Sequence, residues 1–249
     1  MNIKYQPRPP LSKKARRYLR KVLPWSVYLK YFCRHEKMSL ELWRAVAAIT
    51  PDGFSILDIG AYYGEFAMAA REVNQSADVY AFEPNPESLK KLKEITRSHQ
   101  INVVENAISD KNGELYFRCD SQRSQVIDHP SGDTIKVNSR TLDTWIKERQ
   151  IKPFLLKIDV EEASESVILG AKAMLKDSRP LILCEILSDW IGAAVVEALP
   201  DFYNYYYINE NKGLDPKSVV KRFDWRYRNW FFVPPDKENL IPQNLILKP

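Results

Sequence analysis

The chain has 249 residues, of which 45% are hydrophobic, and this is enough for one large α/β domain with a substantial core. It contains no run of 18 or more apolar residues and no apolar signal core near its start, so we expect neither a membrane span nor export. Its cysteines, Cys33, Cys119 and Cys184, are scattered and odd in number. We therefore expect a reducing, cytoplasmic location without a disulfide framework or a Cys-x-x-Cys metal site.

The net charge of +5 is unevenly distributed. Residues 1–50 hold twelve Lys or Arg and two acids, so this segment carries +10 and the remainder −5. The turn Thr-Pro-Asp-Gly at 50–53 predicts a boundary between a basic helical extension, 1–50, and a domain, 51–249. Three interpretations of the extension stay open: a helical cover on the domain, a peripheral contact with an anionic membrane surface, or a guide for an acidic acceptor. We expect no nucleic-acid partner, because no stacking motif or recognition module occurs.

Strands and helices alternate after residue 53. We expect strands at 54–60, 78–83, 101–109, 114–118, 134–138, 154–160, 180–187, 202–208 and 229–234. We expect helices at 65–73, 86–99, 141–150, 164–175 and 189–199, with a polar loop at 119–133. Apolar strands that alternate with helices indicate a parallel sheet, and the last two strands indicate an antiparallel edge pair. The predicted fold is a Rossmann-like, mostly parallel seven-stranded α/β sheet with helices on both faces.

Two glycines stand four residues apart in LDIGAYYGEF, directly after the first strand of the domain. Gly60 permits a tight turn and close approach of a ligand, and Gly64 lets the next helix begin against that ligand. Glu83 ends the following strand, where an acid can accept hydrogen bonds from both ribose hydroxyls. The Asp-x-Gly-x-x-x-Gly spacing is not the dinucleotide pattern, and Glu65 at the helix start disfavours a pyrophosphate. The pattern favours S-adenosylmethionine, which combines a ribose with a cationic or zwitterionic tail.

Charged residues alternate with apolar ones at the end of the strand FLLKIDV. Lys157, Asp159 and Glu161 therefore project the same way while the strand lasts. A hydroxyl accepts a methyl group readily only when a base takes its proton, so Asp159 is the first candidate base and Glu161 the second. Lys157 would pair with one of these acids or steady a developing alkoxide. We expect no metal ion, although Asp159, Glu161 and Glu185 form the oxygen-only set that would hold magnesium or calcium.

Some polar residues have a simpler interpretation. Asp58 could instead accept a hydrogen bond from a backbone N–H in the turn that follows its strand, and this interpretation needs no contact with a ligand. Thr141 and Asp143, in TLDTW, are expected to cap a helix rather than to act in catalysis.

The blocks LDIGAYYGEFAMAA, VYAFEPNPESLKKLKE, NVVENAISDKNGELYF, SRTLDTWI, LLKIDVEEASESVILGAKAML and PLILCEIL occur in this order between about Phe54 and Leu187. In this respect the sequence resembles the FkbM-type methyltransferases, a class I, S-adenosylmethionine-dependent family with a Rossmann-like sheet. The family mostly O-methylates hydroxyls of sugars or natural products. The resemblance implies that the methionine part of the cofactor is cradled by Asp58, Gly60, Ala61, Tyr62 and Gly64. It also implies that Glu83 holds the ribose and that the adenosine is bordered by Pro84, Asn85, Asn106 and Ala107.

The chain departs from the family pattern on the acceptor side. Where the family usually reads Lys-Ile-Asp-Val-Glu-Gly-Ala-Glu, Glu162 replaces the glycine and Ser164 the second glutamate, and Leu187 replaces a histidine. We predict an S-adenosylmethionine-dependent methyltransferase that O-methylates a hydroxyl of a sugar, glycan or natural product. The alternative is a catalytically silent relative that binds the cofactor or serves as an interaction domain. A nicotinamide-dependent enzyme is disfavoured by the glycine spacing.

Overall fold

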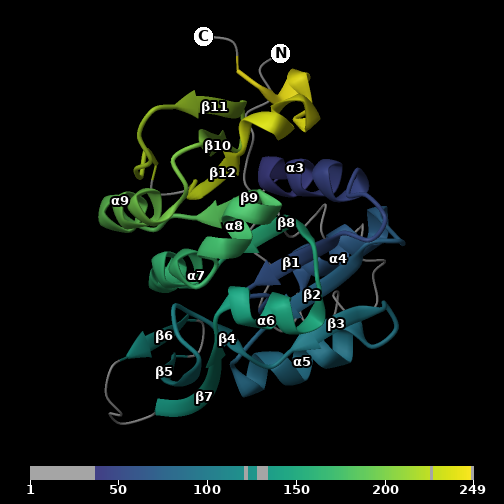
Figure 1. The fold of residues 1–249 in the computed structure, drawn as a ribbon, viewed down its shortest axis with the longest axis vertical. Helices are drawn as coiled ribbons and strands as arrows, with labels where there is room; N and C mark the ends of the chain where they lie inside the picture. The colour runs from purple at the N-terminus through teal and green to yellow at the C-terminus, as the bar shows by residue number, and fades with distance from the viewer. Residues whose placement is uncertain (1–36, 121–122, 128–133, 225–226, 248–249) are drawn as a thin grey trace, which may run out of the picture.

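The computed structural model describes residues 37–120, 123–127, 134–224 and 227–247, and of residues 118–120 and 123–127 it describes the backbone alone. Its centre is an eight-stranded sheet of order β11-β10-β12-β9-β8-β1-β2-β3 (Figure 1). In chain order its strands are β1 (Ser55–Ile59), β2 (Asp78–Phe82), β3 (Ile101–Val104), β8 (Pro153–Ile158), β9 (Leu181–Glu185), β10 (Asn204–Asn209), β11 (Gly213–Lys217) and β12 (Asn229–Val233). Strands β3, β2, β1, β8 and β9 run parallel, as the continuous apolar runs predict.

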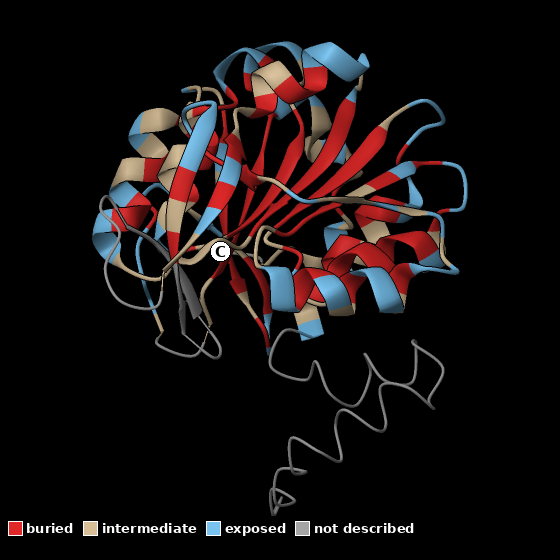
Figure 2. Cartoon of the chain, turned by 90° about the horizontal axis from the view of Figure 1, so that it is seen from below, coloured by how far each residue is buried: buried red, intermediate tan, exposed pale blue. Residues whose placement is uncertain are grey.

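Helices cover both faces of this sheet, which confirms the predicted fold class. One face packs against α3 (Lys37–Ala48), α4 (Glu65–Val73) and α5 (Pro86–Thr96). The other face packs against α6 (Leu142–Arg149), α7 (Ser164–Leu169), α8 (Lys172–Ser178) and α9 (Asp189–Ala198). Figure 2 shows the central strands buried along their length, while strands at the edges and the outer faces of the helices are partly exposed. The amphipathic helices thus bury their apolar sides on the sheet, and the polar loops are left at its edges.

The prediction of seven strands was one strand short. The predicted strands 202–208 and 229–234 form β10 and β12, which pair antiparallel. The additional strand β11 pairs antiparallel with β10 and ends the sheet at that edge. Its sequence, Gly-Leu-Asp-Pro-Lys, contains a proline and two charges. These residues suit an edge strand and do not produce a strand-like sequence pattern.

A second sheet, of order β4-β7-β5-β6, is inserted between β3 and β8. It comprises β4 (Ala107–Ile108), β5 (Gly113–Asp120), β6 (Arg123–Ile127) and β7 (Thr134–Arg140), where β5 and β7 are the predicted strand pair. The predicted strand 101–109 is therefore divided between two sheets, and the predicted loop 119–133 contains β6.

The predicted helix 164–175 is two helices, α7 and α8, separated at Gly170. A Cβ on Gly170 would lie 2.0 Å from the carbonyl oxygen of Ser109, which follows β4.

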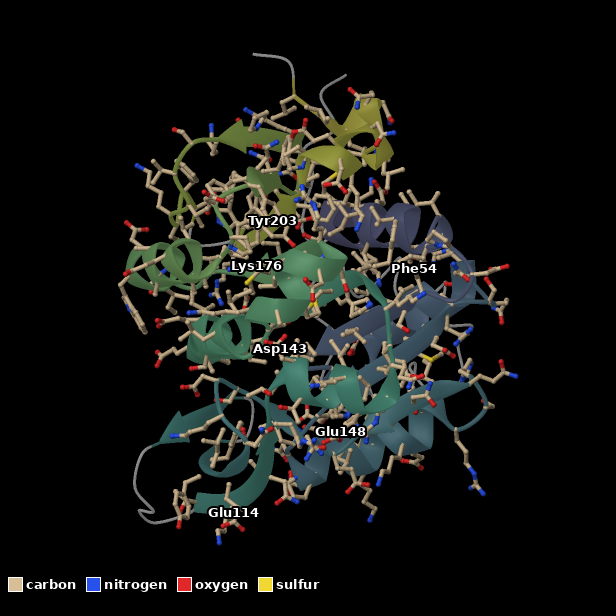
Figure 3. All side chains as sticks on the ribbon, in the orientation of Figure 1. Phe54, Glu114, Asp143, Glu148, Lys176 and Tyr203 are labelled. Carbon is tan, nitrogen blue, oxygen red and sulfur yellow. The ribbon has the colours of Figure 1, made fainter. Side chains whose placement is uncertain are left out.

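Asp143, labelled in Figure 3, accepts hydrogen bonds from the backbone N–H groups of Ala173 and Met174 at the start of α8. Thr141 caps α6 through the N–H of Thr144, as predicted, and Asp143 caps the neighbouring helix.

Helix α3 lies in the segment that the sequence assigns to the basic extension. Its buried side chains belong to the hydrophobic core on the α4 and α5 face of the sheet, and α3 packs against α4 and β10. The rest of that segment, residues 1–36, lies outside the described residues, so the membrane and acceptor roles considered for it stay predictions. In the described part of the chain, no helix is long and apolar enough to cross a membrane.

The buried carboxylate of Glu210 fixes the start of α3. Its Oε2 accepts the backbone N–H groups of Met38 at 2.6 Å and Ser39 at 3.2 Å, and its Oε1 accepts the Ser39 hydroxyl. We expect Glu210→Ala to lower the free energy of unfolding by roughly 1–3 kcal/mol, because it leaves buried donors without partners. Urea denaturation measures this change. The matched control, Glu197→Ala on the exposed side of α9, should change it by less than about 0.5 kcal/mol, and equal losses would refute the anchoring role.

Candidate functional site

A cavity of about 820 Å³ opens beyond the carboxyl ends of β1, β2 and β8. The strand order reverses at this point of the sheet, where open α/β folds bind their ligands. Of the residues predicted for the cofactor, seven line the cavity: Gly60, Tyr62, Glu83, Pro84, Asn85, Asn106 and Ala107. Of the residues predicted for catalysis, Asp159 and Glu161 line it. Asp58, Ala61, Gly64, Lys157 and Glu185 lie outside this lining.

The two glycines of the first loop are required by close packing within the chain. Gly60 and Gly64 both have left-handed backbone, with φ of +81° and +84°. A Cβ on Gly60 would lie 1.9 Å from the carbonyl oxygen of Asp159, and a Cβ on Gly64 would lie 2.7 Å from Leu92 Cδ1. The missing side chains thus leave room for the loop after β8 and for the helix α5. Gly60 also lines the cavity, and the close approach of a ligand to these two glycines stays a prediction.

Asp58 is buried at the end of β1. Its Oδ2 accepts the N–H of Ala67 in the first turn of α4 at 3.1 Å, and its Oδ1 has no hydrogen-bond partner among the described residues. Burial raises the pKa of Asp58 to about 6, although Lys157 opposes this shift. Asp58 thus holds α4 against β1, which is the alternative that the sequence left open. It also occupies one of the N–H groups that a pyrophosphate at this helix would use.

Glu83 lies at the end of β2 with its carboxylate on the cavity wall. Its two oxygens accept the backbone N–H groups of Tyr62 and Asn85, each at 2.8 Å. Burial raises its pKa to about 7, while these two hydrogen bonds lower it. A carboxylate held in this way keeps lone pairs for further donors such as ribose hydroxyls. Asn85 itself caps α5 by accepting the N–H groups of Glu87 and Ser88.

The raised pKa of Glu83 predicts that cofactor binding depends on pH. Only the ionised carboxylate accepts two hydroxyl donors, so affinity for S-adenosylhomocysteine should fall as pH drops below about 7. Between pH 8 and pH 6 the dissociation constant should rise about tenfold, following the ionised fraction. Calorimetric titration measures this change. Glu83→Gln should bind more weakly and lose the pH dependence, and a dependence that survives in Glu83→Gln would assign it to another group.

Lys157, which is buried, and Asp159, which is half-buried, form an ion pair at the end of β8. Lys157 Nζ lies 2.7 Å from Asp159 Oδ2 and 4.5 Å from the centre of the Phe66 ring, and the lysine is buried. Burial opposes ionisation of Asp159, but the charge of Lys157 and its hydrogen bond hold the pKa of Asp159 below its ordinary value. The predicted pairing of Lys157 with one of the acids is therefore present, and Asp159 is ionised at neutral pH.

Glu185 ends β9 beside this pair. Burial and the charge of Asp159 raise the pKa of Glu185 well above its ordinary value, which favours the protonated form of Glu185 beside the ionised Asp159. Arg228 Nη1 lies 3.7 Å from Glu185 Oε1. In the described residues, no group of three or more His, Cys, Asp or Glu side chains is arranged to hold a metal ion. Asp159, Glu161 and Glu185 thus do not form the ligand set that the sequence offered for one.

Two of the three departures from the family pattern lie in the turn η2 (Glu161–Ala163) and at the start of α7, and the third, Leu187, follows β9. The left-handed residue of this turn is Glu161, with φ of +56°, so position 162 does not require the freedom of glycine. Glu162 is exposed and lines the cavity. Ser164 is fully buried, and its hydroxyl has no hydrogen-bond partner among the described residues.

Tyr62 and Tyr63 both line the cavity, and their place between the two glycines predicts that at least one of them forms a pocket wall. Tyr63 stacks on Tyr62, with ring centres 3.7 Å apart, and its hydroxyl accepts a hydrogen bond of 2.7 Å from Lys91. Two further lining residues were not singled out from the sequence. Phe117 and Ile135, which are directly paired in β5 and β7, form an apolar part of the wall. The sequence predicts these two strands but gives no signal that their sheet packs beside the cavity.

The strand order, the acid at the end of β2 and the cavity beyond the carboxyl ends define a Rossmann-like fold of the methyltransferase class. A family model described as the methyltransferase FkbM domain matches residues 58–213. The chain therefore belongs to the FkbM methyltransferase family, which confirms the resemblance predicted from the sequence.

Solved structures of methyltransferases are similar to this chain at low sequence identity. A methyltransferase FkbM from Methylobacillus flagellatus is 16% identical with a TM-score of 0.49, and the match covers 88% of this chain and 58% of that chain. The chain thus spans little more than half the length of that protein. A precorrin-6y C5,15-methyltransferase from Geobacter metallireducens is 15% identical, with a TM-score of 0.43 and coverage of 76% and 82%. Fibrillarin from Aeropyrum pernix, solved with bound S-adenosyl-L-methionine, is 15% identical, with a TM-score of 0.40 and coverage of 76% of each chain. No curated protein gives a significant sequence match.

Proposed function

We propose that this protein transfers a methyl group from S-adenosylmethionine to a hydroxyl of a sugar, glycan or natural product. The observation that carries the proposal is that Glu83 and Asp159 line one cavity from the ends of the two strands that flank β1. Glu83 suits a ribose, and Asp159 is an ionised carboxylate within reach of the same space. Family membership supports the transfer of a methyl group.

The residues present fit this cofactor better than a dinucleotide. Glu83 offers a carboxylate for ribose hydroxyls, and the cavity volume suits a cofactor together with part of an acceptor. Asp58 occupies an N–H at the start of α4, and Glu65 places a second acid there, so a pyrophosphate would meet negative charge. We propose that Glu83 holds the ribose, that Tyr62 and Gly60 border the methionine part, and that Pro84, Asn85, Asn106 and Ala107 border the adenosine.

The acid side chains after β8 would prepare the acceptor. When bound, S-adenosylmethionine supplies an electrophilic methyl group. Asp159 would accept the proton of the acceptor hydroxyl, and the adjacent Lys157 would limit the build-up of negative charge around it. The protonated form of Glu185 would donate to Asp159 and thereby orient that carboxylate toward one geometry.

Two measurements test this proposal. Calorimetry should show binding of S-adenosylhomocysteine and none of NAD, and the reverse result would overturn the choice of cofactor. Transfer of a labelled methyl group should then be followed over a panel of hydroxyl acceptors. The second candidate, favoured by Glu162 and Ser164, is a catalytically silent relative that binds the cofactor. Such a protein would bind S-adenosylhomocysteine but would transfer no labelled methyl group to any acceptor of the panel.

A further inference from the structure

One acidic side chain on the cavity wall departs from the family pattern and has no role in holding the described structure together. Glu162 occupies the family's glycine position, is exposed on the cavity wall, and makes no hydrogen bond or ion pair with any described side chain. The neighbouring acids differ from it in this respect. Asp159 is paired with Lys157, and Glu83 is held by two backbone N–H groups.

The turn that carries Glu162 faces the inserted sheet. Strand β6 contacts η2, and the paired residues Phe117 and Ile135 line the same cavity as Glu162. Ile108, in β4, extends this apolar part of the wall. Among the described side chains, the wall is therefore apolar at Phe117 and Ile135 of the inserted sheet, and the turn after β8 carries a carboxylate.

Such a wall selects among acceptors by charge. A carboxylate with no partner among the described side chains can attract a cation, and a hydrogen bond between two charged groups is stronger than one between neutral groups. Among the residues whose side chains are described, Lys91 is the one lysine or arginine of the lining, and it already donates to Tyr63. Within this described lining, a basic group on the acceptor would thus meet the acid Glu162 with Lys91 as the competing positive charge.

We propose that Glu162 is a specificity-determining residue that binds a protonated amine of the acceptor, so that the preferred acceptors are amine-bearing hydroxyl compounds such as amino sugars. The inference rests on the proposed methyl transfer for its reaction, but the binding of the amine can be measured without turnover. An amine-bearing acceptor also differs from the acidic acceptor that the sequence suggests for the basic N-terminal segment.

The experiment compares a hexosamine glycoside with its N-acetylated form, which lacks the positive charge. With protein saturated by S-adenosylhomocysteine, the amine form should bind about 10–100-fold more tightly by calorimetry. In Glu162→Gln and in Glu162→Gly, which restores the family residue, this ratio should fall to near one. The matched control Glu165→Gln, an acid outside the cavity lining on α7, should keep the ratio of the unmodified protein.

The outcomes separate this inference from the proposed function. If S-adenosylhomocysteine binds but the amine and N-acetyl forms bind equally, the inference fails and the cofactor assignment stands. If S-adenosylhomocysteine does not bind, the proposed function fails. If Glu162 instead holds β6 against the turn, Glu162→Gln will lower the free energy of unfolding and leave the ratio unchanged, which also overturns the inference.

Discussion

Gly60→Ala is expected to be among the most destabilising single substitutions in the protein. A left-handed backbone costs an alanine about 1–2 kcal/mol, and here the added Cβ would also lie 1.9 Å from the carbonyl oxygen of Asp159. Backbone lies on both sides of this contact, so it can be relieved only by separating the loop after β1 from the loop after β8. Urea denaturation should show a loss of roughly 3–5 kcal/mol or no folded protein, since overpacking of this kind adds to the backbone strain.

Gly53 is the matched control for this experiment. It has nearly the same backbone, with φ of +78°, but a Cβ there would find nothing within 4 Å. Gly53→Ala should therefore lose only the conformational part, about 1–2 kcal/mol. If both substitutions cost the same, the contact between Gly60 and Asp159 does not limit stability. Because Asp159 is the candidate base, a displaced loop would also be expected to lower turnover in any Gly60→Ala protein that folds.

The fold was predictable wherever local sequence decides the structure. Strands β1, β8 and β9 are short apolar runs buried on both faces, and they could be identified from composition alone. Helix α6 was predictable from its capping residue Thr141. The errors arose where a distant contact decides. Gly170 ends α7 because the carbonyl of Ser109 approaches it, and β11 forms because β10 offers an open edge.

The candidate site was predictable in its residue types and less so in their roles. Glu83, Asp159 and Glu161 follow predicted parallel strands, so their convergence at one edge follows from topology. Asp58 also follows this rule, yet its carboxylate turns inward to α4, because the first turn of a helix supplies N–H donors. The proton on Glu185 depends on its burial beside Asp159, and sequence spacing does not encode that distance.

Asp159→Asn is expected to have the largest effect on turnover. A positioned base contributes about 10²–10⁴-fold, so kcat should fall by this factor while S-adenosylhomocysteine binds as before. The substitution also removes the anion that pairs with Lys157, so the double variant Lys157→Met with Asp159→Asn controls for that charge. If the fall in kcat comes from loss of the base, the double variant will be as inactive as the single one, although its free energy of unfolding recovers.

The pH dependence of kcat distinguishes a base from a structural acid. Lys157 holds the pKa of Asp159 below its ordinary value, so the ionised base persists to low pH and kcat should not fall between pH 8 and pH 6 through this group. Lys157→Met removes the main charge that lowers this pKa and leaves the neighbouring carboxyl groups of Asp58, Glu83 and Glu185. The pKa of Asp159 should then rise, and the acid limb of the profile should move to higher pH. An acid limb that stays in place in Lys157→Met, or kcat that survives in Asp159→Asn, would exclude Asp159 and leave Glu161, which lines the same cavity, as the base to test.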